Sequence, residues 1–83
     1  MVKIEIFSGP QCAYCAQAKT LLEQHDIPYI DYDISRPEHL REFSRRLPRA
    51  RTIPQIFVNA HHIGNEEDLK LMAQDGRLEA LVG

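Results

Sequence analysis

The chain has 83 residues, of which 43% are hydrophobic and 27% charged, and its net charge is −2. A chain of this length supports one small domain around a single core, and this charge balance favours neither nucleic acid nor a membrane as a partner. No apolar run approaches the ~20 residues of a membrane span, and the first residues lack the apolar core of a signal peptide. We therefore expect a single domain over residues 1–83 in a cytoplasmic protein.

The first half of the chain predicts a strand, a helix and a second strand. Apolar side chains alternate over residues 2–7, and this period of two is typical of a strand. After the Gly9-Pro10 break, apolar residues recur at helical spacing from Ala13 to His25, and alternation returns over Tyr29–Ile34. A strand–helix–strand unit forms a right-handed crossover between parallel strands.

A second helix is predicted next. Ser35 and Glu38 have the spacing of a capping box, in which a serine hydroxyl and a glutamate satisfy the first amides of a helix. Apolar residues then recur at helical spacing until Pro48 ends the pattern. The short apolar run Gln55–Val58 predicts a third strand.

The remaining residues predict a hairpin and a helix. Asn59–His61 is a plausible tight turn into a short fourth strand at His62–Ile63. A helix should begin at Asn65, because the acidic residues that follow interact favourably with the positive end of the helix dipole. This helix should end near Gly76, and a last helical turn should follow it. The predicted fold class is α/β, in the order β-α-β-α-β-β-α, with a four-stranded mixed sheet flanked by helices.

The segment Pro10–Lys19, PQCAYCAQAK, contains the only two cysteines, Cys12 and Cys15. Cys12 begins a predicted helix, where free amides and the positive dipole end stabilise a thiolate. Cys15 shares its helix face with Ala18 and Leu22, so we expect it to be shielded. This asymmetry suits an attacking thiol and a resolving thiol, and C-x-x-C beside a βαβ pattern is typical of a redox couple.

Other uses of the cysteine pair remain open at this point. A structural disulfide would close a minimal loop and add little stability. A zinc site needs about four ligands, and His61 and His62 are adjacent, without the usual ligand spacing. Two chains could also bridge an iron–sulfur cluster through Cys12, because such a cluster needs four thiolates.

Three motifs together resemble the glutaredoxins, of the small bacterial dithiol class, over nearly the whole chain. Cys12-Ala13-Tyr14-Cys15 is similar to the family's C-P-Y-C. Arg51–Phe57 is similar to the T-V-P segment and the strand that follows it, and His62–Leu69 to the I-G-G-x-x-D-L segment. The resemblance implies the thioredoxin-like fold of this family.

The resemblance also implies an activity, with Cys12 and Cys15 as catalytic residues. Glutaredoxins reduce protein–glutathione mixed disulfides and protein disulfides, with glutathione as the co-substrate and with neither a bound cofactor nor a metal. The implied partners are glutathione and glutathionylated or disulfide-containing proteins, of which ribonucleotide reductase is a family example, and we expect a monomer. Two alternatives stay open: an electron carrier reduced by thioredoxin reductase, and an iron–sulfur cluster-binding dimer.

The resemblance further implies a glutathione site. The family's proline at Pro54 is cis and lies against the cysteines, so that the backbone before it pairs with an extended peptide. A helix start at Asn65 would bind one glutathione carboxylate and nearby acids its ammonium, while an arginine would bind the other carboxylate. The implied glutathione-binding residues are Tyr14, Arg49, Arg51, Thr52, Ile53, Pro54, Gly64, Asn65, Glu66, Glu67 and Asp68.

Four positions depart from the family pattern. Gly9 stands where a lysine is frequent, and Ala13 replaces the proline between the cysteines. Asn65 replaces the second glycine of the usual pair and could cap a helix, while Glu66 adds negative charge beside the expected anion site. We expect these changes to alter the redox poise and to weaken glutathione binding.

Five arginines lie close together, and two interpretations of them stay open. They form either a solvated helix face paired with Glu38 and Glu42, or a steering patch for anionic glutathione or an acidic protein. The cluster consists of Arg41, Arg45, Arg46, Arg49 and Arg51.

Overall fold

The computed structural model describes residues 2–82, without the side chain of Val82. Its elements are β1 (Ile4–Ser8), α1 (Ala13–Gln24), β2 (Ile30–Asp33), α2 (Pro37–Arg46), β3 (Gln55–Val58), β4 (His61–Gly64), α3 (Glu66–Gln74) and α4 (Arg77–Val82). The predicted order is confirmed up to α3, and the expected last helical turn is a short separate helix. No helix of the described residues is long and apolar enough to cross a membrane.

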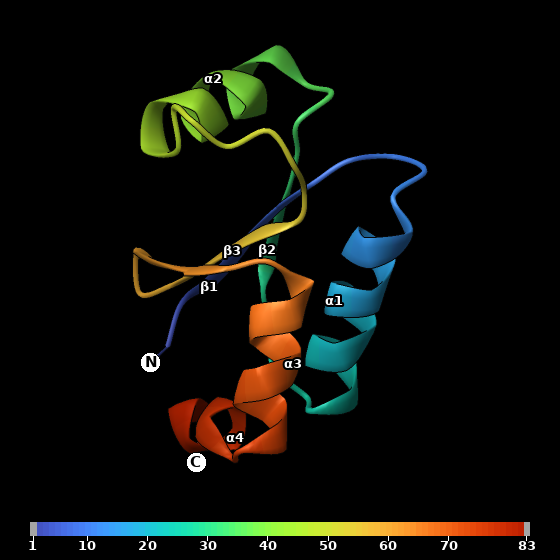
Figure 1. Cartoon of the computed structure of the whole chain (residues 1–83), viewed down its shortest axis with the longest axis vertical. Helices are drawn as coiled ribbons and strands as arrows, with labels where there is room; N and C mark the ends of the chain where they lie inside the picture. Colours follow the sequence, from blue (N-terminus) through green and yellow to red (C-terminus); the bar gives the residue numbers. More distant parts are fainter. Residues whose placement is uncertain (1, 83) are drawn as a thin grey trace.

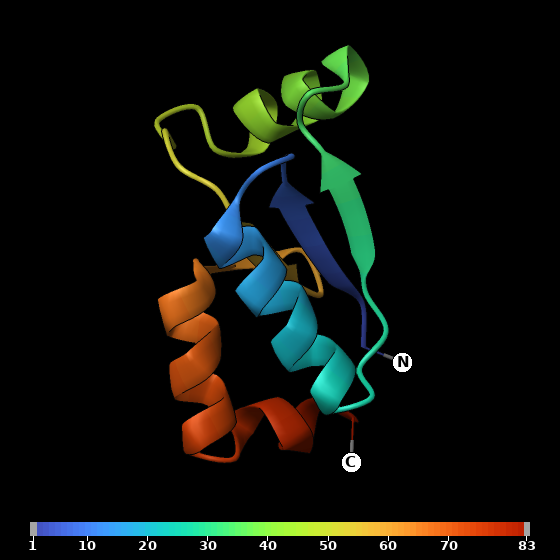
Figure 2. The same cartoon turned by 90° about the vertical axis from the view of Figure 1, so that its right-hand side faces the viewer.

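The four strands form one sheet in the order β2-β1-β3-β4. β1 runs parallel to β2 and antiparallel to β3, and β3 runs antiparallel to β4. Helix α2 lies apart from α1, α3 and α4, on the other side of the sheet (Figures 1 and 2). This mixed sheet between helices confirms the predicted fold class.

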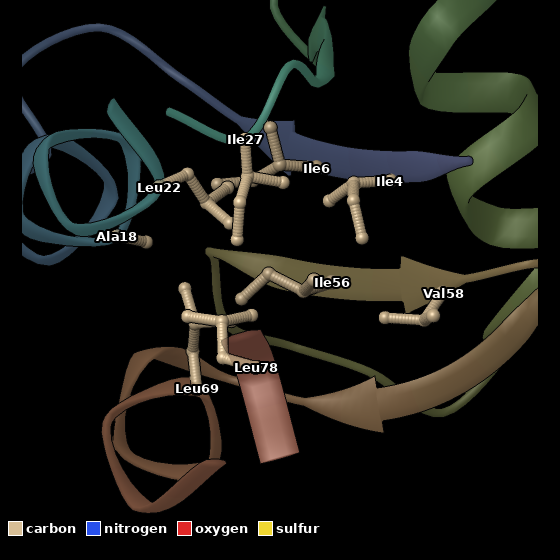
Figure 3. Close-up of a cluster of buried hydrophobic side chains, with 9 residues drawn as sticks. All are labelled: Ile4, Ile6, Ala18, Leu22, Ile27, Ile56, Val58, Leu69 and Leu78. Carbon is tan, nitrogen blue, oxygen red and sulfur yellow. The ribbon is translucent and has the colours of Figure 1, made fainter. Parts of the chain in front are cut away.

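The central position of β1 explains why its burial differs from the simple alternating pattern. All five residues of the strand are buried, because helices cover the sheet on both faces. Ile4 and Ile6 face α1 and α3, whereas Phe7 packs with Phe43 on the α2 side. The larger core cluster, drawn in Figure 3, joins the sheet to α1, α3 and α4.

A partly buried ion pair joins α2 to the sheet. Both terminal nitrogens of Arg46 donate to the carboxylate of Glu5 at 3.0 Å, and the Glu5 side chain is only 1% exposed. The guanidinium also lies over the rings of Phe7 and Phe57, and the Tyr32 hydroxyl donates to Glu5. These hydrogen bonds, above all those from Arg46, hold the pKa of Glu5 below its ordinary value of 4.5 although burial raises it.

The capping box predicted at Ser35 and Glu38 is wrong. The N-cap of α2 is Arg36, which makes no side-chain cap bond, and Pro37 occupies the first turn. The Ser35 amide instead donates to the Asp33 carboxylate at 2.9 Å. The Asp33 side chain therefore stabilises a turn before the helix. Pro37 suits the first turn of α2 because it has no amide hydrogen that would need a capping partner.

The turn of the hairpin is shorter than predicted. Asn59 and Ala60 both have a positive φ, of 50° and 69°, so they form a two-residue turn and His61 already belongs to β4. Positive φ at both central residues matches the right-handed twist of the strands that they join. The Asn59 side chain also accepts a hydrogen bond from the Lys3 amide at 2.8 Å.

Candidate active site

The two cysteines lie at the N-terminus of α1 with very different exposure. Cys12 is the N-cap, and its Sγ accepts a hydrogen bond from the Cys15 amide at 3.2 Å. Cys15 lies in the first turn and is 1% exposed, on the face that also buries Ala18 and Leu22. The two sulfurs form a disulfide, with the Cα atoms 5.2 Å apart. The predicted asymmetry between an accessible and a shielded cysteine is therefore confirmed.

The segment before β3 lies against Cys12. The Ile53–Pro54 peptide bond is cis, as the resemblance implied, and Pro54 is buried. The Ile53 carbonyl lies 3.9 Å from Cys12 Sγ. Gly9 approaches the same segment, because a Cβ added there would come within 2.9 Å of the Ile53 Cδ1 atom. A lysine at Gly9, frequent in the family, would require the Ile53 side chain to move.

Cysteines that differ in this way can exchange disulfides. The partly exposed cysteine can react with a partner, and the buried one can then resolve the mixed disulfide. The family model for glutaredoxins matches residues 4–63 of the chain. The chain belongs to the glutaredoxin family. It is accordingly a thiol–disulfide oxidoreductase, and its Cys12–Cys15 pair is at disulfide distance.

Glutaredoxins of similar length match nearly the whole chain. A glutaredoxin of Neisseria meningitidis serogroup B is 38% identical, and the match covers 99% of this chain and 98% of that protein. Glutaredoxin 3 of Escherichia coli K12 is 33% identical, with 99% of each chain covered. The solution structure of a glutaredoxin from Brucella melitensis superposes on this chain with a TM-score of 0.79. The two sequences are 38% identical, and the match covers 98% of this chain and 88% of that chain.

The N-terminus of α3 is capped by its own side chains. The Asn65 carboxamide accepts from the amides of Glu67 at 3.0 Å and Asp68 at 3.3 Å, and the Asp68 carboxylate accepts from the Asn65 amide. This confirms that Asn65 starts and caps the helix. The amides of Glu67 and Asp68 are therefore already bonded and are not available to an anion. Within the described residues, the Glu66 amide at the start of the helix has no hydrogen bond to a capping side chain.

The residues around this cap differ in exposure. Glu66 is 8% exposed, whereas Glu67 and Asp68 are exposed. Gly64 has a φ of +124°, and a Cβ added there would lie 2.0 Å from the Asp68 carboxylate, so the capping box needs glycine at this position. The Glu66 side chain is thus largely covered by its neighbours, whereas Glu67 and Asp68 lie at the surface.

The predicted cationic and aromatic contacts all lie at the surface. Tyr14 is 58% exposed, and Arg49 and Arg51 are also exposed, with no ion-pair partner within residues 2–82. The rest of the basic cluster is divided. Arg45 and Arg46 both bind Glu42, and their hydrogen bonds lower the pKa of that carboxyl to about 2. Arg45 therefore fits the interpretation of a solvated helix face paired with Glu42. Arg49 and Arg51 form no ion pair within residues 2–82, so their charges remain available to a ligand.

Among the glutathione-binding residues expected from the resemblance, Ile53 is the one that makes a non-bonded polar contact with the cysteine pair within residues 2–82. The Ile53 carbonyl lies beside Cys12 Sγ, and Tyr14 lies between the two cysteines in the chain. Thr52 accepts two hydrogen bonds from the Gln55 carboxamide.

Among residues 2–82, no group of three His, Cys, Asp or Glu side chains is arranged to hold a metal ion.

Sequence reasoning missed a polar cluster next to this site. The Ser8 hydroxyl donates to Asp31 Oδ1 at 2.5 Å, and Asp31 Oδ2 pairs with Lys19 Nζ at 2.6 Å. One signal was available, because Lys19 follows Cys15 by one helical turn and so lies on the same side of α1. Its partner Asp31 lies in another element, and no local pattern connects the two.

Proposed function

We propose that this glutaredoxin uses glutathione to reduce protein–glutathione mixed disulfides and protein disulfides through Cys12 and Cys15. The observation that carries the proposal is the contrast between the partly exposed Cys12 at a helix N-cap and the buried Cys15 behind it. An amide hydrogen bond and the positive end of the helix dipole both favour the anionic form of Cys12.

The first reaction needs only Cys12. Its thiolate attacks the glutathione sulfur of a protein–glutathione disulfide, so that the Cys12–glutathione bond forms and the protein leaves as a thiolate. A second glutathione thiolate then attacks this mixed disulfide, releases glutathione disulfide and restores Cys12.

The second reaction uses both cysteines. Cys12 attacks a protein disulfide and forms a mixed disulfide with the protein. Cys15 then attacks Cys12 Sγ, the protein leaves fully reduced, and the Cys12–Cys15 disulfide remains for glutathione to reduce.

The proposed glutathione pose places the tripeptide backbone along Thr52–Pro54, beside Tyr14. Its γ-glutamyl carboxylate would bind at the start of α3, next to Gly64 and Asn65, with the Glu66 amide as donor. Its ammonium would lie near Glu67 or Asp68, and its glycine carboxylate near Arg49 or Arg51. The unpaired charge of these arginines and the position of Ile53 beside Cys12 support this pose.

One observation favours a second candidate, a carrier reduced by thioredoxin reductase. Asn65 occupies two of the amides that a glutathione carboxylate would use, and Gly9 offers no cation. The test is reduction of the oxidised protein by each electron source separately. Reduction by glutathione supports our proposal, whereas reduction by thioredoxin reductase alone supports the second candidate. Both candidates act as monomers in a reducing compartment, and we propose the cytoplasm.

A further inference from the structure

A chain of side-chain hydrogen bonds joins strand β4 to the segment that lies beside Cys12. The Gln55 carboxamide nitrogen donates to the Thr52 carbonyl at 3.1 Å and to the Thr52 hydroxyl at 3.3 Å. The carboxamide oxygen of Gln55 lies 2.8 Å from Nε2 of His62, which belongs to β4. The residue after Thr52 is Ile53, whose carbonyl lies 3.9 Å from Cys12 Sγ.

Gln55 is a polar side chain in a buried position at the start of β3. It is 8% exposed, and it is the register partner of Phe7 on the central strand β1. A buried amide costs free energy unless its donor and its acceptor both find partners. An apolar side chain would fill this position without that requirement, so packing alone does not account for an amide here.

The directions of these hydrogen bonds follow from the groups involved. A carbonyl oxygen only accepts, so the end of the Gln55 side chain that faces Thr52 is its NH2 group. The other end is the carboxamide oxygen, so His62 donates to it from Nε2. The His62 ring packs on Phe57, its register partner on β3, with the ring centroids 5.2 Å apart. His62 therefore holds the Gln55 side chain in the orientation that serves Thr52.

The segment that receives these bonds has little support from its own backbone. Thr52 and Ile53 lie outside the helices and strands, and within residues 2–82 neither takes part in a hydrogen bond between backbone groups. Pro54 has no amide hydrogen to donate. Apart from the contact with Cys12, the hydrogen bonds that restrain Thr52 and Ile53 among the described residues come from Gln55.

We propose that Gln55 and His62 are positioning residues that hold Thr52 and Ile53 in the conformation to which the substrate peptide binds. The inference rests on the proposed function, in which the glutathione backbone lies along Thr52–Pro54. A segment that is ordered before binding loses little backbone freedom when the peptide arrives. Gln55 acts through Thr52, and His62 acts through Gln55.

Steady-state reduction of a glutathionylated peptide tests this role. Gln55→Met keeps the length of the side chain and removes its donor and acceptor. We expect kcat/KM for the peptide to fall about tenfold, which corresponds to the entropy of ordering one backbone residue at the moment of binding. The rate at which iodoacetamide alkylates Cys12 in the reduced protein should not change, because this small reagent does not bind along the segment.

Variants of β4 provide a graded comparison and a control. His62→Phe keeps an aromatic ring against Phe57 but cannot donate, so kcat/KM should fall by less than in Gln55→Met. His62→Gln again offers an Nε2 donor and should restore the wild-type value. His61→Phe is the control, because within the described residues the neighbouring His61 side chain makes no hydrogen bond, and its kcat/KM should be normal. His62 is exposed, so its variants test the inference even if Gln55→Met does not fold.

Backbone ¹⁵N relaxation of the free protein measures the ordering directly. In the wild type the amides of Thr52 and Ile53 should have order parameters of about 0.85, the value of a rigid backbone, and in Gln55→Met these should fall to about 0.6. A role confined to overall stability would lower the unfolding free energy and leave these two order parameters unchanged.

Each outcome decides between the inference and its alternatives. Loss of order together with slower peptide reduction supports the positioning role. Rigid Thr52 and Ile53 in Gln55→Met, a normal kcat/KM despite their mobility, or equal slowing of alkylation and peptide reduction would overturn it and leave the proposed function intact. Absence of turnover by the wild type would refute the proposed function, whereas the relaxation comparison would still decide whether Gln55 orders the segment.

Discussion

The amide of Cys15 donates a hydrogen bond to the Sγ atom of Cys12 at 3.2 Å. The side chain of Cys12 therefore caps α1 by bonding to the backbone of Cys15. A hydrogen bond to an ionised acceptor is stronger than one to a neutral acceptor. In the reduced protein the same contact would therefore favour a thiolate at Cys12. The buried Cys15 has no comparable donor at its own sulfur among the described residues.

Replacement of Cys12 by serine should abolish every exchange reaction, because a hydroxyl is not an effective nucleophile toward a disulfide. Serine is among the preferred N-cap residues, so the start of α1 should remain intact. Turnover of a glutathionylated peptide measures the activity, and circular dichroism confirms the fold. Residual turnover above that of the buffer would show that another group attacks.

Replacement of Cys15 by serine should separate the two reactions. Reduction of a glutathionylated peptide should persist, because the partly exposed Cys12 completes that cycle with glutathione alone. Reduction of a protein disulfide should fall to background, since no thiol remains to resolve the mixed disulfide. Both substrates are measured with the same protein preparation. Loss of both activities would mean that Cys15 does more than resolve.

Replacement of Asn65 by glycine should lower the KM for glutathione. The variant frees the Glu67 and Asp68 amides, which Asn65 now occupies, for a carboxylate. The free energy of unfolding should fall by only a few tenths of a kcal/mol, because glycine is tolerated at an N-cap.

Asn65→Asp is the matched control for this change. It keeps the cap and adds a negative charge, so the KM should rise. If neither variant alters the KM, glutathione does not bind at the start of α3.

Replacement of Glu5 by glutamine should destabilise the protein at neutral pH by roughly 2 kcal/mol, because it removes the charge that accepts two hydrogen bonds from Arg46 and leaves that guanidinium with only the more exposed Glu42. The pKa of Glu5 is lower in the folded chain than its ordinary 4.5, so its ionised form favours folding above that value. This contribution disappears as the pH falls through the lowered pKa.

Urea unfolding of wild type and Glu5→Gln from neutral to acidic pH measures the effect. The difference in unfolding free energy should be full above pH 4.5 and shrink below it. The control is Glu42→Gln, which removes the more exposed carboxylate bound to Arg46 and should cost much less. A difference that is independent of pH would show that the charge of Glu5 does not stabilise α2.

Local patterns in the sequence predict the redox centre but not its surroundings. The position of Cys12 before a helix and of Cys15 on its buried face follows from neighbouring residues alone. Ser35 failed as a cap because Pro37 and the Asp33 carboxylate together set a different start for α2. A capping motif describes only one of the local arrangements that its residues can adopt.

Contacts between distant residues were beyond sequence reasoning. Glu5 is buried because β1 is covered on both faces, and its partner Arg46 lies 41 residues away. Ser8 and Asp31 meet across two strands, 23 residues apart in the chain. A polar residue in an alternating pattern is usually expected to face water, and only the packed fold shows that it has a buried partner.

The most direct test of the proposed function is steady-state reduction of a glutathionylated peptide, with glutathione and glutathione reductase as the sole electron source. We predict turnover that requires Cys12, saturates with glutathione and survives Cys15→Ser. Absence of turnover by a protein whose disulfide is readily reduced by thioredoxin reductase would contradict this function and show that the redox centre draws its electrons elsewhere.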